Sequence, residues 1–280
     1  IIWNDFTVFF IIDSKFFQRI TNNDNFYSIL SDNSNKISLF NKDHNYGIYL
    51  LFKKIMKVWE EIGMGYFWGD LFDVRFFVIN LIKNDNVEKI LDLGCGIGMI
   101  SHFSNSKLKI GLELQEKSIK NAKKLNPDME LIRGDIRFLP FKNNVFPKIL
   151  SIHSLSSMST PEQRKIAVSE INRVLNEKGE IIASAANLRS KHYSKKFTLS
   201  ERLGYVNYKE LVEVFKNEFN IRVEGFNPYP KWLTGVLRRI IMKLSENEKK
   251  DELIFKTLKS EKFLKNGRGF FMILKKKSEH

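Results

Sequence analysis

Short apolar runs alternate with amphipathic segments from Val87 onward, and this alternation sets the expected fold. Helical segments follow most of the runs. Strands that alternate with helices indicate βαβ units. We therefore expect an α/β, Rossmann-like fold: a mostly parallel sheet with helices on both faces. The predicted strands are Lys89–Leu93, Lys109–Leu114, Met129–Ile132, Lys148–His153, Glu180–Ala185, Ile221–Phe226 and Phe270–Leu274.

The best-marked helix is predicted over Pro161–Leu175. Thr160 is a suitable N-cap, and proline is favoured in the first helical turn that follows it. Gln163 stands three residues after Thr160, which is the spacing of a capping box. We expect Gly179 to help end this helix before the next strand.

Residues 1–86 are rich in Phe and Asn, and they predict helices joined by polar loops, which we interpret as an N-terminal helical cap. Tyr49–Ile62 has apolar residues at helical spacing, and Leu71–Ile82 is helical and almost wholly apolar, hence buried. The Rossmann-like domain then spans 87–280, with a helical insertion at about 227–268 before the last strand. Within that insertion, Pro230–Leu244 is cationic and amphipathic. It either contacts a membrane surface or a lipid, or covers the core or a substrate cavity.

Cysteine usage and hydropathy indicate a cytoplasmic protein. Cys95 is the single cysteine, which excludes an internal disulfide and a cysteine-rich zinc site. The apolar opening Ile1–Ile12 is too short to span a bilayer, and no cationic stretch precedes it as in a signal peptide. We therefore expect no integral membrane segment and no metal site.

The net charge of +14 is unevenly distributed. Residues 1–86 carry nine Lys/Arg against ten Asp/Glu, whereas the rest of the chain carries 37 against 22. A basic surface favours an anionic partner such as nucleic acid, a phosphorylated metabolite or a lipid headgroup. The alternative is that the charge serves only solubility.

The strongest motif is Ile90–Gly98, with the sequence ILDLGCGIG. A buried strand runs into a tight glycine turn that opens a helix. Gly94 and Gly96 let the backbone approach a ligand closely, and Gly98 allows close helix packing. Such a triplet by itself also suits NAD, FAD or a purely structural turn.

Two acidic residues follow at informative positions. Glu113 ends the second strand about 20 residues after the glycine turn, where a carboxylate can accept hydrogen bonds from both ribose hydroxyls. Asp135 follows the third strand in Gly134-Asp135-Ile136, within reach of an adenine amino group. The aspartate at the end of the first strand and the later Gly-Asp pair disfavour a dehydrogenase.

With these motifs and the segment EINRVLNEKGEIIAS (170–184), the sequence resembles the class I S-adenosylmethionine-dependent methyltransferases, particularly the broad group that includes quinone- and RNA-modifying enzymes. The resemblance covers about residues 87–186. It implies a transferase with S-adenosyl-L-methionine as cofactor and a seven-stranded sheet whose last strand is antiparallel. It also implies that Asp92, Gly94 and Gly96 hold the methionine portion, Glu113 the ribose, and Asp135 with Ile136 the adenine. The expected cofactor contacts are completed by Cys95, Leu114 and Ser151.

Two sequence elements that particular methyltransferase reactions require are absent, which limits the reactions expected. The fourth strand ends in Ser151-Ile152-His153-Ser154, without the Asn/Asp-Pro-Pro-aromatic element that grips amino nitrogens of adenine or glutamine. Cytosine C5 methylation needs a cysteine nucleophile, but the only cysteine lies in the glycine turn. An O, N or C nucleophile remains. His153 is the candidate general base because strand-four ends face the reacting methyl group in this fold; alternatively it only packs beside the cofactor.

Three functions of the protein stay open, two of which differ in the methyl acceptor. A small organic or lipid-like substrate is favoured by the aromatic cap and the insertion. RNA of the tRNA type is favoured by the loop Asn187–Lys209, where cations alternate with aromatic residues, although this loop also suits a solvated lid. The third function is a non-catalytic binding partner that keeps the fold. The oligomeric state is not predicted.

Overall fold

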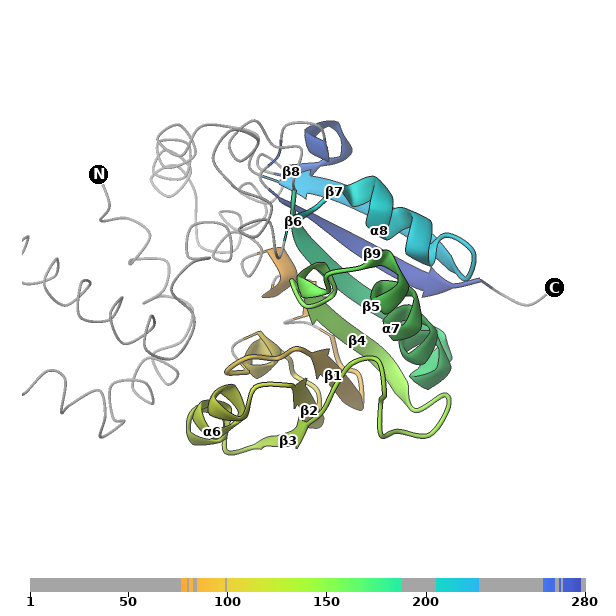
Figure 1. Cartoon of the computed structure of the whole chain (residues 1–280). Helices are drawn as coiled ribbons and strands as arrows, with labels where there is room; N and C mark the ends of the chain where they lie inside the picture. Colours follow the sequence, from red (N-terminus) through yellow and green to blue (C-terminus); the bar gives the residue numbers. More distant parts are fainter. Residues whose placement is uncertain are drawn as a thin grey trace, which may run out of the picture. The chain divides into compact units, whose positions relative to one another are not determined.

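The computed structural model describes residues 77–79, 81–82, 85–98, 100–187, 205–226, 259–264, 267 and 269–277. These residues form one mixed sheet with helices against it (Figure 1). Its seven longer strands match the predicted ones within a few residues: β1 (Lys89–Leu93), β2 (Leu108–Glu113), β3 (Met129–Arg133), β4 (Phe146–Ile152), β5 (Leu175–Asn187), β7 (Phe219–Phe226) and β9 (Gly269–Lys276). Two short strands are added: β8 (Lys259–Ser260) at the edge of the sheet beside β7, and β6 (Tyr205–Val206) against the end of β5.

The strand order is β3-β2-β1-β4-β5-β9-β7-β8, and β6 pairs with β5. The pairs from β3 to β5 are parallel, whereas β9 is antiparallel to both β5 and β7. The Rossmann-like fold and the antiparallel last strand are therefore confirmed. Chain order reverses between β1 and β4, which makes the carboxyl ends of these two strands the topological switch point where such sheets bind ligands.

Alternation along the strands separates two apolar cores, because successive side chains of a strand point to opposite faces. Leu91, Ile149 and Ile181 pack in one cluster, with buried residues of α7 (Pro161–Val174) and α8 (Tyr208–Phe215). The adjacent residues Ile90, Leu150 and Ile182 pack in the other cluster, with Phe77, Val78 and Ile82. Residues 77–79 and 81–82 are helical, and these three apolar side chains are fully buried, as predicted for Leu71–Ile82.

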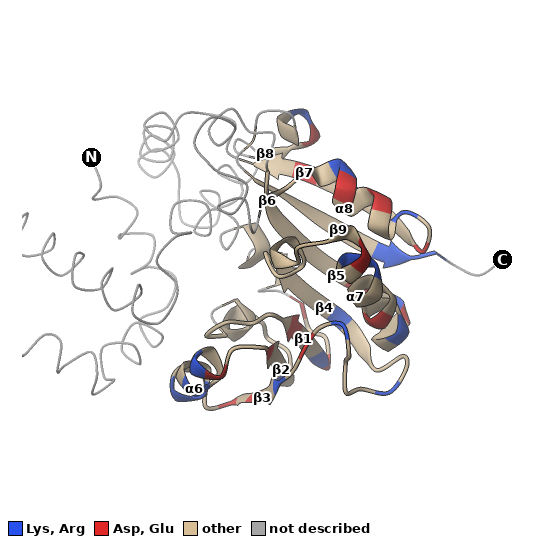
Figure 2. Ribbon diagram, viewed as in Figure 1, with Lys and Arg blue, Asp and Glu red and all other residues tan. Residues whose placement is uncertain are grey.

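The remaining helices are α6 (Glu116–Leu125), which contacts β2 and β3, and the 3-10 turns η1 (Ser101–Phe103), η2 (Leu155–Ser157) and η4 (Glu261–Leu264). Charged residues of α6 are mostly lysines, whereas α7 and α8 carry both positive and negative residues (Figure 2).

The predicted start of α7 is confirmed, but its end differs from the prediction. The Thr160 hydroxyl accepts a hydrogen bond from the Gln163 backbone N–H at 3.2 Å. The helix ends at Val174, and Leu175 already begins β5. Gly179 therefore does not terminate the helix. It lies inside β5, where the pairing with β4 shifts register, and a Cβ there would come within 2.7 Å of the Leu175 side chain.

A buried ion-pair network ties the segment before β1 to the sheet. The Lys148 ammonium, on β4, contacts the Asp85 carboxylate and donates to Glu180 on β5 at 2.7 Å. Burial by itself lowers the pKa of Lys148, but the hydrogen bonds to the two carboxylates outweigh it and leave this pKa raised. Lys148 is buried and needs these partners, so its pairing with Asp85 links the entry of the chain into β1 to the sheet.

Several predicted elements fall outside the described residues. They are the helix Tyr49–Ile62 and nearly all of the cap, most of the insertion 227–268 with its Pro230–Leu244 stretch, and all but the ends of the loop Asn187–Lys209. The division of the chain at residue 86 stays a prediction. In the part of the chain that the structure describes, no helix combines the length and apolar character needed to cross a bilayer.

Candidate functional site

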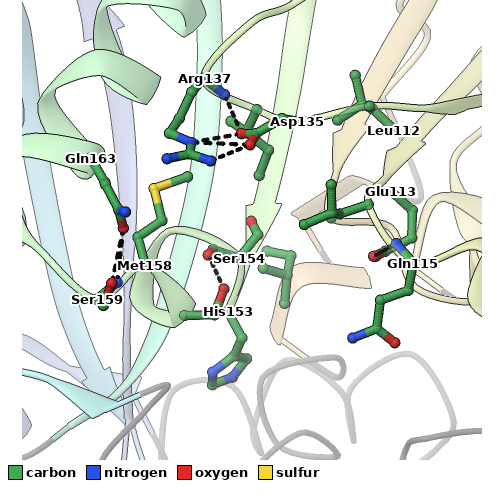
Figure 3. Close-up of a pocket in the computed structure, with 16 residues that line it drawn as sticks. Leu112, Glu113, Gln115, Asp135, Arg137, His153, Ser154, Met158, Ser159 and Gln163 are labelled. Carbon is green, nitrogen blue, oxygen red and sulfur yellow. Dashed lines mark hydrogen bonds and ion pairs between the residues drawn. The ribbon is translucent and has the colours of Figure 1, made fainter.

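A pocket of about 430 Å³ lies at the carboxyl ends of β1, β2, β3 and β4, at the switch point of the sheet. This is the position expected for a ligand in an open α/β sheet, and its volume is in the range of small-molecule sites. One wall comes from β1, β2 and β3, and the opposite wall comes from the segment after β4 and the first turn of α7 (Figure 3). The lining residues are Gly94, Leu112, Glu113, Leu114, Gln115, Gly134, Asp135, Ile136, Arg137, Ile152, His153, Ser154, Ser157, Met158, Ser159 and Gln163.

The glycine turn after β1 is held against β2 by its backbone. The Leu112 carbonyl accepts hydrogen bonds from the Gly94 N–H at 2.7 Å and from the Cys95 N–H at 3.2 Å. Gly94 has φ +67°, and a Cβ on it would lie 2.6 Å from the Ser154 Cβ. The absence of a side chain at Gly94 is thus required by the neighbouring segment after β4, not only by an approaching ligand.

Gly96 differs from Gly94 in what surrounds it. Its φ is +56°, but a Cβ built there would meet nothing within 4 Å. Its N–H donates to Glu113 Oε2 at 3.0 Å, while Glu113 Oε1 accepts from the Gln115 N–H at 2.9 Å. The Glu113 carboxylate at the end of β2 is therefore pinned by two backbone donors, with open space beside the turn that it holds.

Asp92, two residues before the turn, is only 3% exposed. Burial raises its pKa to about 7, and the nearby Glu113 charge adds to the rise, while hydrogen bonds with Ser101 oppose it. A carboxyl group with such a pKa changes its charge in the neutral range. Asp92 does not line the pocket, and it lies two residues before the glycine turn that does.

Asp135, which follows β3, is held by a clamp from Arg137. The Arg137 guanidinium donates through Nε to Oδ1 at 3.0 Å and through Nη2 to Oδ2 at 2.5 Å, and the Arg137 backbone N–H donates to Oδ1 at 2.9 Å. These hydrogen bonds lower the pKa of Asp135, so it remains an acceptor at neutral pH. Both residues line the pocket.

The segment after β4 supplies hydroxyl groups and His153. His153 has φ +61°, a conformation that only a few per cent of non-glycine residues adopt, and it lines the pocket. Its backbone N–H donates to the Ser184 carbonyl at 3.0 Å, which anchors it to β5. Ser151 is fully buried and shares a 2.7 Å hydrogen bond with the Ser154 hydroxyl, so Ser154 rather than Ser151 reaches the pocket.

The structure brings together six of the ten predicted site residues as pocket lining: Gly94, Glu113, Leu114, Asp135, Ile136 and His153. Asp92, Cys95, Gly96 and Ser151 are not among the lining residues. Cys95 is a partly buried thiol whose pKa is raised by burial, which disfavours a nucleophilic role. Sequence reasoning missed Arg137 and, apart from His153, the residues of the wall after β4. Gln163 had been interpreted only as a capping residue, although its place at the start of the helix after strand four already pointed toward this end of the sheet.

Comparison with known proteins finds similarity to methyltransferases over part of the chain. Residues 90–179 match the family model described as a methyltransferase domain. A demethylmenaquinone methyltransferase from Thermotoga maritima is 34% identical over 109 residues, which cover 38% of this chain and 46% of that protein. A sterol 24-C-methyltransferase from Pneumocystis carinii is 34% identical over 102 residues, covering 33% of this chain and 26% of the relative. The chain thus spans less than half the length of these two relatives.

Solved structures extend the likeness in fold beyond the matched segment. The crystal structure of an S-adenosylmethionine-dependent methyltransferase from Thermotoga maritima superposes with a TM-score of 0.55. The superposition covers 83% of this chain and 99% of that chain, at 16% sequence identity. At this identity, the likeness concerns the fold alone.

Proposed function

We propose that the chain, whose residues 90–179 match a methyltransferase domain, is a class I S-adenosylmethionine-dependent enzyme that transfers a methyl group to an O, N or C nucleophile of a small organic or lipid-like substrate. The observation that carries this proposal is the pocket at the switch point. There the glycine turn, Glu113 and Asp135 meet a wall of neutral polar side chains.

The pocket residues fit S-adenosylmethionine in their chemistry. Gly96 leaves open space where a side chain would otherwise stand, beside a carboxylate whose remaining lone pairs can accept ribose hydroxyls. Asp135 is an ionised acceptor suited to an amino group of adenine. Acidic residues on the wall formed by β1, β2 and β3 also favour a cationic ligand, and S-adenosylmethionine carries a sulfonium and an amino group.

The cofactor supplies an electrophilic methyl group, and the protein orients the partners. Class I transfer depends chiefly on holding the nucleophile in line with that methyl group, which the wall after β4 would do. His153 lines this wall, and we keep it as the proposed base for a hydroxyl or carbon acid. Asp92, Gly94, Cys95, Gly96, Leu114, Ile136 and Ser151 are proposed to hold the cofactor or support the residues that do.

Calorimetry with S-adenosylhomocysteine and NAD tests this assignment. We expect S-adenosylhomocysteine to bind and NAD to give no measurable heat, because the ribose and adenine contacts stand in the order of a methyltransferase site. Transfer of labelled methyl to fractionated metabolite, lipid and RNA pools then reports the acceptor class. Preference for NAD would contradict the proposal.

The affinity for S-adenosylmethionine is expected to rise with pH between 6 and 8. The pKa of Asp92 is about 7, so its carboxylate is mostly protonated at pH 6 and mostly ionised at pH 8. If a cationic cofactor binds the ionised form, the ionised fraction and hence the affinity should increase about tenfold over these two pH units.

The comparison needs Asp92→Asn, a variant whose pH step should vanish because it lacks the titrating carboxyl group. The cofactor-free protein should show the opposite trend in stability. A carboxyl with a raised pKa in the folded state binds more protons when folded, so the free energy of unfolding falls as pH rises from about 4 to about 7. A pH step that persists in Asp92→Asn would show that Asp92 is not its source.

RNA remains the alternative acceptor because the positive charge is concentrated after residue 86. A phosphate-binding surface would retain tRNA in a strongly salt-dependent manner. Weak, salt-insensitive retention supports the small-molecule acceptor. A third possibility, a non-catalytic binding partner, predicts cofactor binding without transfer to any pool.

A further inference from the structure

The wall of the pocket after β4 carries an amide whose orientation is set by the protein. Gln163, in the first turn of α7, accepts at Oε1 from the Ser159 backbone N–H at 3.2 Å and from the Ser159 hydroxyl at 3.1 Å (Figure 3). A backbone N–H can only donate, so the amide atom facing it must be the oxygen. The Nε2 amino group is therefore directed away from Ser159, on a side chain that lines the pocket.

Most hydroxyl protons of this wall are already used within the protein. Ser157 donates to the Ser154 carbonyl at 2.6 Å and Ser159 donates to Gln163, while Ser151 and Ser154 share one hydrogen bond that uses one of their two protons. None of the described residues accepts a hydrogen bond from Gln163 Nε2. The two N–H groups of this amide are thus side-chain donors that the wall offers to a ligand.

The charged residues of the pocket limit the kind of ligand that the Gln163 N–H groups can bind. Glu113 and Asp135 line the opposite wall, and the Arg137 guanidinium is engaged with Asp135, so the pocket disfavours an anion. A cationic amine brings only donors and cannot satisfy another donor. A neutral carbonyl oxygen can accept from the amide without either penalty. Met158 and Ile152 also line the pocket and add apolar surface for such a molecule.

We propose that Gln163 forms a carbonyl-binding subsite for the methyl acceptor, and that the acceptor is an uncharged molecule bearing a carbonyl oxygen. This inference rests on the proposed methyltransferase function, with the cofactor against β1, β2 and β3 and the acceptor against the wall after β4. Ser159 is a positioning residue in this arrangement because it acts through the Gln163 amide.

Gln163→Glu is the decisive variant. It keeps an oxygen for Ser159, and glutamate is itself a preferred residue at this capping position, so the fold should be retained. It replaces the two N–H donors with an acceptor. Gln163→Met, which has similar length but no charge and no donor, separates loss of the donors from gain of a negative charge. Glu162→Gln, on the adjacent exposed residue, is the matched control.

The probes are 1-tetralone, 1-aminotetralin and tetralin-1-carboxylate, which share one skeleton but differ in charge at the same position. They are titrated by ligand-observed NMR into the full chain saturated with S-adenosylhomocysteine. We expect wild type and Glu162→Gln to bind 1-tetralone about tenfold more tightly than either charged analogue. Gln163→Glu and Gln163→Met should each lose about tenfold in 1-tetralone affinity, since the carbonyl then lacks its donor. Ser159→Ala should lose less, because the backbone N–H still holds the amide oxygen.

Calorimetry of S-adenosylhomocysteine, measured first, separates the two levels of the proposal. Absence of cofactor binding in the wild type refutes the methyltransferase function and the subsite with it. Normal cofactor binding together with equal affinities for the three probes, or with 1-tetralone affinity unchanged in both Gln163 variants, overturns the subsite alone. Thermal unfolding of each variant confirms that the comparison is made between folded proteins.

Discussion

Replacing Glu113 by alanine is expected to weaken S-adenosylhomocysteine binding by at least tenfold. Its carboxylate is proposed to accept two ribose hydroxyls, and a hydrogen bond to a charged group contributes about 1.5–3 kcal/mol before desolvation is subtracted. The structure adds a second cause. The same carboxylate accepts from the N–H groups of Gly96 and Gln115, so the glycine turn loses a support as well.

The two causes can be separated by measuring cofactor binding and unfolding together. Glu113→Gln retains an acceptor oxygen but turns an amide NH₂ toward one of the two backbone donors, so it should also weaken binding and destabilise the cofactor-free protein. Glu116→Gln is the control, because Glu116 is an exposed residue of the next turn that pairs with Lys120 and Arg133 outside the pocket. Unchanged affinity in Glu113→Ala would show that this carboxylate does not bind the ribose.

Gly94→Ala is expected to destabilise the cofactor-free protein by about 3 kcal/mol. A left-handed backbone costs an alanine about 1–2 kcal/mol, and φ at Gly94 is +67°. The new Cβ would also stand 2.6 Å from the Ser154 Cβ, and overpacking of this kind typically costs a further 1–3 kcal/mol. Chemical denaturation measures the loss.

Gly96→Ala is the matched comparison within the same turn. It has a similar backbone strain, at φ +56°, but its Cβ would meet no atom within 4 Å. The cofactor-free protein should therefore lose only about 1 kcal/mol, which is the backbone cost alone, while cofactor affinity drops because the side chain occupies the proposed ligand space. Ser154→Gly should restore part of the stability of Gly94→Ala and none of that of Gly96→Ala. Equal destabilisation by the two alanines would contradict this distinction.

Properties that depend on neighbouring residues in the chain could be predicted from the sequence. Short apolar runs predicted the seven longer strands, and three glycines after the first of them predicted the tight turn, in which all three have positive φ. The helix expected after this turn was wrong, because only the 3-10 turn η1 stands between it and β2 in the described residues. Thr160 before Pro161 predicted the start of α7, since a capping hydrogen bond joins residues three apart. The matched methyltransferase domain, residues 90–179, lies within the stretch where these local signals are densest.

Contacts between residues far apart in sequence were decided by the tertiary structure. Pairing of β1 with β4 brings the Ser154 Cβ onto Gly94, and pairing of β4 with β5 completes the Lys148 network with Glu180. The same pairings place Gly179 at a register shift inside β5 rather than at the end of a helix. They also bring Gln163 to the pocket wall. A sequence pattern records which face of an element is buried, but the partner on that face is chosen by strand order and register. The glycine turn and its acidic partners therefore carried the resemblance that implied the cofactor. The hydrogen-bond donors proposed for the methyl acceptor became visible only in the tertiary structure, where the segment after β4 lies across the pocket from that turn.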